Sequence, residues 1–403
     1  MKILYITATY KPSVNGVSVS VENTSKELKN RGHDVYILAP KKSEYTKKEK
    51  HVFRYPSLPN PLQPDYPIPL FPLTRQIIKL LFKTKFDIVH AHHPFIVSFF
   101  ADVVSSLNDI PMIFTYHTRY DQHFKLNLKF IPDDVSEKYA YYTTRRVCRR
   151  ADLIIAPSKF IQKYIKKNYK NVRIEVLPTG VENVHKNDSK LKLKKRYKLP
   201  SNKKILISVI RLSSEKNVHL LLGALKNLPE EYHLVLVGDG PIKGNLKNLA
   251  LHLEIEKRIS FMGKVKHNEV FNFYKLADIH VFPSFSETQG IVFLEAFSFG
   301  LPTVAVKSEV NKEWVLEGLG YLSKNNPNDF AKKIIMADAL ERRRVKTISD
   351  KLVKKHSIQN TAQKLEEIYK KAMQMHKLKK TVRKNIKNKI KGIDKFIRDL
   401  MQI

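Results

Sequence analysis

The chain has 403 residues, of which 42% are hydrophobic, and it includes 21 Phe and 18 Tyr. That length suggests two domains, and that apolar content excludes a protein that is disordered over most of its length. With 73 Lys and Arg against 38 Asp and Glu, the formal net charge is +35, which leaves three explanations open: binding to nucleic acid, binding to an anionic membrane surface, or a lysine-rich composition that spreads charge over the whole surface.

The cysteine count and the hydropathy pattern limit the cellular compartments in which the protein is expected. The single cysteine, Cys148, cannot form an internal disulfide, so a reducing environment is expected. Residues 1–8 read as a short strand rather than a secretion signal, whose apolar stretch would be longer. The strongest apolar run, residues 94–107, is interrupted by Asp102 and falls short of the roughly 20 residues that span a bilayer. We therefore expect a cytoplasmic protein that is soluble or bound to a membrane surface.

Short apolar runs alternate with helix-length segments along the first half of the chain. A helix is expected over residues 17–31, after the first run. The runs lie at residues 3–6, 35–38, 87–90, 112–115, 152–155 and 174–177. Because continuous apolar strands that alternate with helices form parallel sheets covered on both faces, we expect a doubly wound domain over residues 1–180.

The second half repeats this pattern, and a second doubly wound domain is expected over residues 181–376. Its apolar runs lie at residues 205–209, 233–237, 259–262, 279–282 and 303–306. Residues 151–158 and 277–284 resemble each other in sequence, as two similarly built domains would. Ligands of such sheets bind beyond the carboxyl ends of the strands. The predicted α/β architecture, two Rossmann-like domains that face each other, therefore places the active site in the cleft between them.

Polar motifs follow several strands of the first domain. Gly16 lies in the loop after the first strand and precedes a helix, whose free N–H groups can approach a phosphate or a sugar. The polar and aromatic side chains after the later strands include His90, His92, His93, Tyr116 and His117. Packing explains one such residue but not so many. A zinc site is an alternative for the three neighbouring histidines, although a clear further ligand is missing.

Two cations follow the first strand of the second domain. Arg211 and Lys216 lie five positions apart in a turn, and paired cations of this kind can neutralise a diphosphate leaving group. A solvated charged loop is the alternative.

Two carboxylates follow a later strand. Glu287 and Glu295 lie eight positions apart around a turn that leads into an apolar helix near Ile291. The free N–H groups at a helix start can bind a phosphate, so one carboxylate can face each sugar of a sugar nucleotide. A capping residue followed by an ordinary surface glutamate is the alternative.

Together these motifs resemble a retaining glycosyltransferase of family 4, with the two-domain GT-B architecture, over nearly the whole chain to about residue 370. Within the family, they look like the diacylglycerol glucosyltransferases. The segments that carry the resemblance are Gly16, residues 87–95, 115–118, 156–158, 177–181, 211–217, 238–241 and 286–296. One position departs from the family, which usually has glycine where this chain has Ile210.

The resemblance implies a role for each motif residue. Arg211 and Lys216 would bind the donor diphosphate, and Glu295 the ribose. The donor sugar would contact Glu287 and the backbone of Thr288, Gln289, Gly290 and Ile291. His117 would touch the sugar near its reacting face, and Gly16 would let the first domain close on it. The acceptor side would be lined by His90, His92, His93 and Tyr116.

The chemistry implied by the resemblance is a same-face displacement at the anomeric carbon, in which the leaving phosphate helps to deprotonate the acceptor. The negative charge that develops on the diphosphate can be stabilised by Arg211, Lys216 and a helix N-terminus. The sequence has no Asp-X-Asp motif, so no metal is expected at the diphosphate. No cofactor is expected either, because the nucleotide sugar is itself a substrate.

The last segment, residues 377–403, carries ten basic and two acidic residues. Apolar residues recur in it every three or four positions: Leu378, Val382, Ile386, Ile390, Ile393, Ile397 and Leu400. This spacing predicts a basic amphipathic helix. It can bind an anionic membrane surface, or it can pack on a partner or dimerise.

The sequence features that indicate the acceptor are less specific than those that indicate the donor. Residues 56–72 contain seven prolines among apolar residues, an extended loop that either packs under its own domain or faces a lipid. Gln289 and the Thr-Tyr-His-Thr motif look like those of diacylglycerol glucosyltransferases. The expected function is transfer of a hexose, glucose from UDP-glucose, to diacylglycerol or a related lipid at the inner face of the cell membrane. A phosphatidylinositol, glycan or soluble acceptor is an alternative.

A protein of another class, a non-catalytic basic protein that binds nucleic acid or membranes, is also compatible with the charge. The intact set of Arg211, Lys216, Glu287 and Glu295 argues against it, because a decaying enzyme would lose such residues first. No specific nucleic acid partner is therefore expected.

Overall fold

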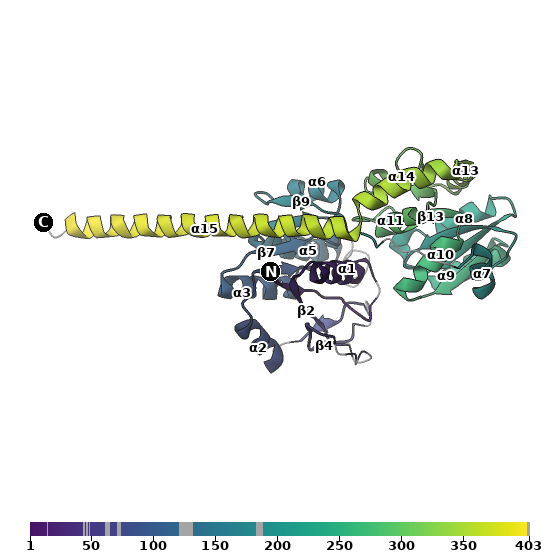
Figure 1. Ribbon diagram of the computed structural model, residues 1–403. Coiled ribbons are helices and arrows are strands. Elements are labelled where there is room, and N and C mark those ends of the chain that lie inside the picture. Colours follow the sequence, from purple (N-terminus) through teal and green to yellow (C-terminus); the bar gives the residue numbers. More distant parts are fainter. Residues whose placement is uncertain are drawn as a thin grey trace.

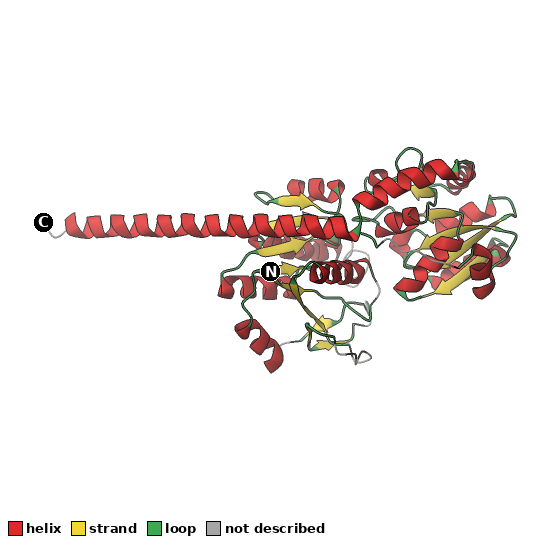
Figure 2. Cartoon of the chain, in the orientation of Figure 1, coloured by secondary structure: helices red, strands yellow, loops and turns green. Residues whose placement is uncertain are grey.

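The computed structural model describes residues 1–13, 15–42, 45, 47, 49–60, 65–70, 74–120, 132–182 and 188–400. Two sheets of parallel strands, each flanked by helices, form two neighbouring domains, and one long helix runs along the first domain and continues beyond it (Figure 1). Figure 2 shows both sheets enclosed by helices. The predicted α/β architecture of two Rossmann-like domains is confirmed.

The first sheet has seven strands in the order β3-β2-β1-β6-β7-β8-β9, all of them parallel. They are β1 (Lys2–Ile6), β2 (Asp34–Pro40), β3 (Val52–Tyr55), β6 (Ile88–Ala91), β7 (Met112–Thr115), β8 (Leu153–Ala156) and β9 (Ile174–Val176). The six predicted strands are present. Edge strand β3 was missed because three of its four residues are only partly buried, so it forms no continuous apolar run.

Helices cover both faces of this sheet. They are α1 (Gly16–Asn30), α2 (Arg75–Lys83), α3 (Ile96–Asn108), α5 (Asp133–Arg150) and α6 (Lys159–Asn168). Buried apolar residues of α2, α3, α5 and α6 form one core cluster, and those of α1 form another on the opposite face. In the proline-rich segment, β4 (Ser57–Leu58) and β5 (Ile68–Pro69) pair antiparallel.

The second sheet has six parallel strands in the order β12-β11-β10-β13-β14-β15. They are β10 (Lys204–Val209), β11 (Tyr232–Val237), β12 (Ile259–Gly263), β13 (Ile279–Phe282), β14 (Thr303–Val306) and β15 (Gly320–Ser323). Its helical elements are α7 (Lys190–Arg196), η1 (Ser214–Lys216), α8 (His219–Lys226), α9 (Lys243–His252), η2 (Glu256–Arg258), α10 (His267–Leu276), α11 (Ile291–Ser298), α12 (Asn311–Trp314), α13 (Pro327–Asp338) and α14 (Arg342–Lys355).

Helix α15 (Ile358–Leu400) returns the chain to the first domain. The sequence analysis placed residues 358–376 in the second domain, but Leu365, Ile368 and Tyr369 lie in the core cluster of α1, on the first sheet. The physical reason is the helical spacing of these apolar residues, which matches a sheet face that α1 alone leaves open. The segment predicted as a separate tail from residue 377 is the continuation of the same helix (Figure 1).

The two crossings between the domains lie side by side. Val181, on the way out, bridges to Ser357, on the way back. At Gly180 a Cβ atom would lie 2.6 Å from Oγ1 of Thr361 and 2.8 Å from Cα of Ile358. Only glycine allows this approach, so the two segments that connect the domains are closely packed and joined by a β-bridge.

Candidate active site

The turn after β10 carries the predicted cations at the carboxyl edge of the second sheet. Helix η1 ends at Lys216, and Asn217 then adopts a left-handed conformation, with φ of 56°. Its amide Nδ2 donates to the carbonyl oxygen of Pro283 (3.1 Å), at the end of β13. This bond brings the cation turn next to the carboxylate turn that follows β13.

Lys216 and Glu287 meet across these two turns. The Nζ atom of Lys216 lies 2.6 Å from Oε1 of Glu287, and the two side chains are 21% and 15% exposed. The predicted diphosphate ligand and the predicted sugar ligand are therefore paired with each other. A bound diphosphate would compete with Glu287 for the ammonium group.

Arg211 faces the first domain. Within the described residues its guanidinium forms no hydrogen bond or ion pair. Burial raises the pKa of the Tyr66 hydroxyl to about 12, the neighbouring Asp65 acts in the same direction, and the charge of Arg211 opposes both. Arg211 is thus a cation at the domain boundary that keeps its charge available for a ligand.

The glycine that the family usually has before the arginine is replaced by Ile210, and the close approach is made from the other side. At Gly238, after β11, a Cβ atom would lie 2.0 Å from the carbonyl oxygen of Ile210, and at Gly240 one would lie 2.1 Å from that of Leu212. The Gly-Asp-Gly turn therefore positions the backbone around Arg211.

The turn before α11 is bound to the first domain through two side chains. The hydroxyl of Thr288 donates to the carbonyl oxygen of His117 (2.7 Å). Gln289 accepts from the backbone N–H of Thr179 (2.8 Å) and donates to its carbonyl oxygen (3.0 Å). Thr288 and Gln289, both predicted to contact the donor sugar, thus also hold the two domains together.

Helix α11 begins at Ile291 without a side-chain cap, because the preceding residue is Gly290, with φ of 74°. A Cβ atom at Gly290 would lie 2.8 Å from the ring of Phe293. Among the described residues no side chain caps this helix start, and the N–H of Phe293 donates to the carbonyl oxygen of Gly290 (3.1 Å). At the start of α1, no described atom outside the neighbouring residues and the helix backbone lies within 4 Å of the Cβ position of Gly16.

Glu295 is buried one turn into α11. Its Oε2 accepts from the hydroxyl of Tyr274 (3.0 Å), and its Oε1 lies 3.2 Å from Nε2 of His267. Burial alone would lower the pKa of His267, but the hydrogen bond and charge of Glu295 outweigh it and raise the pKa. The sequence analysis missed Tyr274 and His267, since nothing in their spacing marks them as neighbours of a carboxylate.

The predicted histidines form a buried stack in the first domain. Nδ1 of His92 lies 3.0 Å from Nε2 of His117, and the ring of His92 stacks on that of His90 at 4.2 Å. Nε2 of His92 is buried with no hydrogen-bond partner among the described residues. Burial lowers the pKa of His90 and of His117 to about 3. These rings are therefore neutral at physiological pH.

His90, at one end of the stack, and Tyr116 are both buried. Both ring nitrogens of His90 are hydrogen-bonded, Nδ1 to the hydroxyl of Tyr369 (2.8 Å) and Nε2 to that of Thr115 (2.7 Å). Tyr116 belongs to the core cluster beneath α3, α5 and α6. Both side chains are therefore held in the interior of the first domain.

The remaining histidine of the motif, His93, accepts from the backbone N–H of Ala8 through Nδ1 (3.0 Å). In the part of the chain that the structure describes, no group of three or more His, Cys, Asp or Glu side chains is arranged to hold a metal ion.

Two family models match the chain: Glycosyltransferase Family 4 over residues 14–183, and Glycosyl transferases group 1 over residues 189–351. The chain is 29% identical over 317 residues to an alpha-monoglucosyldiacylglycerol synthase of Streptococcus pneumoniae (strain ATCC BAA-255 / R6), with 76% of this chain and 71% of that protein covered. It is 26% identical over 351 residues to an alpha-monoglucosyldiacylglycerol synthase of Acholeplasma laidlawii, with 83% and 87% covered.

The fold is similar to that of Anabaena Alr3699/HepE, solved in complex with UDP. The TM-score is 0.72 at 19% sequence identity, with 92% of this chain and 100% of that chain covered. This likeness concerns the arrangement of the two domains. Among the described residues, no helix is both long enough and apolar enough to cross a membrane.

Proposed function

The chain is a glycosyltransferase of the GT-B type, in which a family 4 domain precedes a group 1 domain, and we propose that it transfers glucose from UDP-glucose to diacylglycerol at a membrane surface. The observation that carries the proposal is that Lys216 and Glu287 are paired in the turns that precede the uncapped start of α11. Thr288, in the same turn as Glu287, donates to the carbonyl oxygen of His117 in the first domain. A cation, a carboxylate and an uncapped helix start are partners that a nucleotide sugar needs.

The donor would lie across the carboxyl edge of the second sheet, as ligands of doubly wound sheets do. Its diphosphate would meet Arg211, Lys216 and the first N–H groups of α11. Glu295, which Tyr274 and His267 hold in place, would accept hydrogen bonds from the ribose hydroxyls. Lys216 would then lie between the diphosphate and Oε1 of Glu287, and the other carboxylate oxygen of Glu287 would accept from hydroxyls of the sugar.

Sugar transfer requires that the bond between the anomeric carbon and the diphosphate oxygen breaks. The developing negative charge would be stabilised by Arg211 and Lys216, whose contribution is largest where water is excluded. The acceptor oxygen would form the new bond on the same face, and its proton would pass to the leaving phosphate oxygen. The anomeric configuration would thereby be retained.

His117 would contact the donor sugar as a neutral imidazole. Its pKa of about 3 excludes a role as a permanent cation at neutral pH. It can instead exchange a hydrogen bond with a sugar hydroxyl, while His92 and the carbonyl contact from Thr288 fix its position. This arrangement orients the sugar without adding charge on the side where the acceptor approaches.

The lipid acceptor is supported by two relatives whose names state that they are monoglucosyldiacylglycerol synthases. The basic segment at the end of α15 would hold the enzyme to anionic lipid, each nearby Lys or Arg contributing about 1 kcal/mol. Such an enzyme would act as a peripheral protein on the inner face of the cell membrane.

The proposal is tested with the purified protein, labelled UDP-glucose, and liposomes of anionic lipid with or without diacylglycerol. Label in a lipid product only when diacylglycerol is present would support donor and acceptor together. If UDP binds but no lipid is labelled, the acceptor or the sugar is wrong, and labelled UDP-galactose, UDP-N-acetylglucosamine and soluble acceptors are the next substrates to offer. No binding of UDP would overturn the donor assignment itself.

A further inference from the structure

A groove on the first domain lies between α3 and α5, apart from the residues of the candidate active site. Its volume is ≈ 290 Å³, and its lining includes Phe95, Phe99, Met112, Tyr139, Arg146 and Arg150. The walls are mostly aromatic and aliphatic, and the arginines lie at the rim. None of these residues has a role in the proposed transfer reaction.

The backbone at one end of the groove is strained. Phe95, the residue before α3, has φ of 67°, a conformation that bulky residues rarely adopt. In this conformation its ring stacks on that of Tyr139 from α5, with centroids 5.7 Å apart and an angle of 11° between the planes. The unusual backbone conformation of Phe95 thus places its aromatic ring between α3 and α5.

Large apolar side chains around the groove are exposed to solvent. Tyr142 is 61% exposed, Tyr139 56%, Val135 50% and Phe99 43%. A surface that combines such residues on two adjacent helices marks an interaction site, because a soluble protein otherwise covers them. Tyrosine suits the interface between water and lipid, since its ring is apolar and its hydroxyl is polar.

Four arginines of α5 adjoin these side chains. A second hollow, ≈ 370 Å³ in volume, is lined by Tyr142 together with Arg145, Arg146, Arg149 and Arg150. Arg150 is paired with Asp102 (2.8 Å), and Arg146 lies over the ring of Phe99, 5.2 Å from its centroid.

The other two arginines are exposed. Within the described residues, Arg145 and Arg149 form no hydrogen bond or ion pair. Their charge is left for an external anion, and guanidinium groups match the oxygens of a phosphate in geometry as well as in charge.

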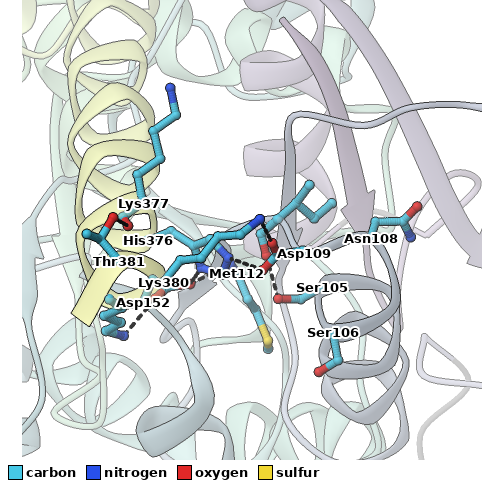
Figure 3. Close-up of polar contacts among 12 residues, drawn as sticks. Ser105, Ser106, Asn108, Asp109, Met112, Asp152, His376, Lys377, Lys380 and Thr381 are labelled. Atoms are coloured by element: carbon cyan, nitrogen blue, oxygen red, sulfur yellow. Dashed lines mark hydrogen bonds and ion pairs between the residues drawn. The ribbon is translucent and has the colours of Figure 1, made fainter. Parts of the chain in front are cut away.

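Helix α15 packs on the opposite face of the sheet from the groove and passes the amino ends of β7 and β8, where Met112 lines the groove. Asp152 accepts from the backbone N–H of Met112, which lines the groove, and also binds Nδ1 of His376 (3.1 Å) and Nζ of Lys379 (2.7 Å). Asp109, just after α3, binds Nε2 of His376 (3.2 Å) and Lys380. Figure 3 shows His376 and Lys380 reaching from α15 to these two carboxylates, next to Met112. The groove and the basic segment beyond residue 380 therefore share one edge of the domain.

From these observations we infer that the α3–α5 groove binds an anionic phospholipid of the membrane surface. Arg145 and Arg149 contact the phosphate diester, and the aromatic walls take the adjoining part of an acyl chain. Cations beside an apolar groove complement a lipid that carries both a phosphate and a chain. The site goes beyond the transfer reaction, because it needs neither donor nor acceptor and fixes how the first domain lies on the membrane.

Binding to vesicles tests this site without any sugar transfer. The full chain is sedimented with vesicles of phosphatidylcholine that contain or lack phosphatidylglycerol, in the absence of UDP-glucose and diacylglycerol. The variant Arg145→Gln/Arg149→Gln should bind the anionic vesicles about 25-fold more weakly, about five-fold for each arginine. The matched control, Arg343→Gln/Arg344→Gln, removes two exposed arginines from α14 of the second domain and should stay within about two-fold of wild type.

A local probe separates the groove from the basic end of α15. Tyr142→Trp places a fluorophore in the arginine-lined hollow beside the groove, and the single native tryptophan, Trp314, is 4% exposed in the second domain and serves as the internal control. Brominated acyl chains should quench Trp at position 142 and leave Trp314 unchanged. An unquenched Trp at position 142 in vesicle-bound protein would overturn the inference. So would equal losses in the two arginine pairs, or retention of vesicle binding by the groove variant with loss of binding to duplex DNA.

Discussion

The pairing of Lys216 with Glu287 leads to a prediction about the variant Lys216→Ala. Wild type presents a compensated pair, with 2.6 Å between Nζ and Oε1. The substitution removes a cation that would bind the diphosphate, and it also leaves a carboxylate unpaired beside the incoming negative charge. Two costs therefore add, whereas Arg211→Ala removes only a cation.

The magnitudes follow from the two effects. Loss of one charge-assisted contact costs about 1.5–3 kcal/mol. Repulsion between the carboxylate and one phosphate charge at roughly 8 Å adds about 2 kcal/mol at an effective dielectric constant of about 20. Together they weaken UDP binding by about 3.5–5 kcal/mol, or about 400-fold to 5,000-fold, against about 10-fold to 150-fold for Arg211→Ala.

Calorimetric titration with UDP measures these differences directly. In the double variant Lys216→Ala/Glu287→Gln the repulsion is gone, so UDP affinity should recover about 30-fold relative to Lys216→Ala. As a matched control, Lys204→Ala breaks an ion pair with Asp338 (2.7 Å) at the opposite end of the same strand, β10, and should leave UDP affinity unchanged. The reasoning is refuted if Lys216→Ala weakens UDP binding no more than Arg211→Ala does and Glu287→Gln restores nothing.

Three further predictions concern the fold around the site. Gln289→Ala leaves the buried N–H and carbonyl of Thr179 without their partners and should lower the free energy of unfolding by about 2–3 kcal/mol in urea titrations; a change below about 0.5 kcal/mol would show that this link is not formed in solution. Gly290→Ala forces a side chain into a positive φ and against a ring at 2.8 Å, so it should cost about 1–3 kcal/mol and lower Tm by several degrees, and an unchanged Tm would contradict the turn. Burial lowers the pKa of His90 and of His280 to about 3. These groups bind protons between about pH 6.5 and 3 only after unfolding, so their stability contribution is complete above about pH 6.5 and is lost as pH falls. From pH 7.5 to 5.5 they should lower the free energy of unfolding by about 3 kcal/mol, and replacing each by Gln should flatten the pH dependence.

The sheets could be predicted from the sequence because their central strands are fully buried. All four residues of β6, β7 and β8 are buried, and such strands appear as continuous apolar runs. Strand β3 and the return of α15 to the first domain could not be predicted in this way. Strand β3 is only partly buried. The packing of α15 depends on which of the two sheets has an uncovered face, and residue spacing does not reveal this.

The candidate site was predicted where residue type alone indicates chemistry. Arg211, Lys216 and Glu287 were identified as charged residues in turns at strand ends, and the structure brings the last two into contact. Contacts between residues that are far apart in the sequence could not be predicted. Thr179 binds Gln289 through its backbone, and a backbone partner leaves no mark in the sequence.

The glycine-rich turn after β11 shows the same limit. Gly238 belongs to a turn type found in many proteins, and its importance lies in the 2.0 Å between its Cβ position and the carbonyl oxygen of Ile210. That distance depends on how two separate turns pack, so it appears only in the structure.

The central claim is the proposed transfer of glucose from UDP-glucose to diacylglycerol, in which the charge of Arg211 would stabilise the leaving diphosphate. The most direct measurement is the initial rate at which label from UDP-glucose enters the lipid phase of diacylglycerol vesicles, for wild type and for Arg211→Ala. We predict diacylglycerol-dependent labelling by wild type and a rate about 10-fold to 150-fold lower for Arg211→Ala at subsaturating donor. Equal rates for the two proteins, or no lipid label from a wild-type protein that binds UDP, would contradict the claim.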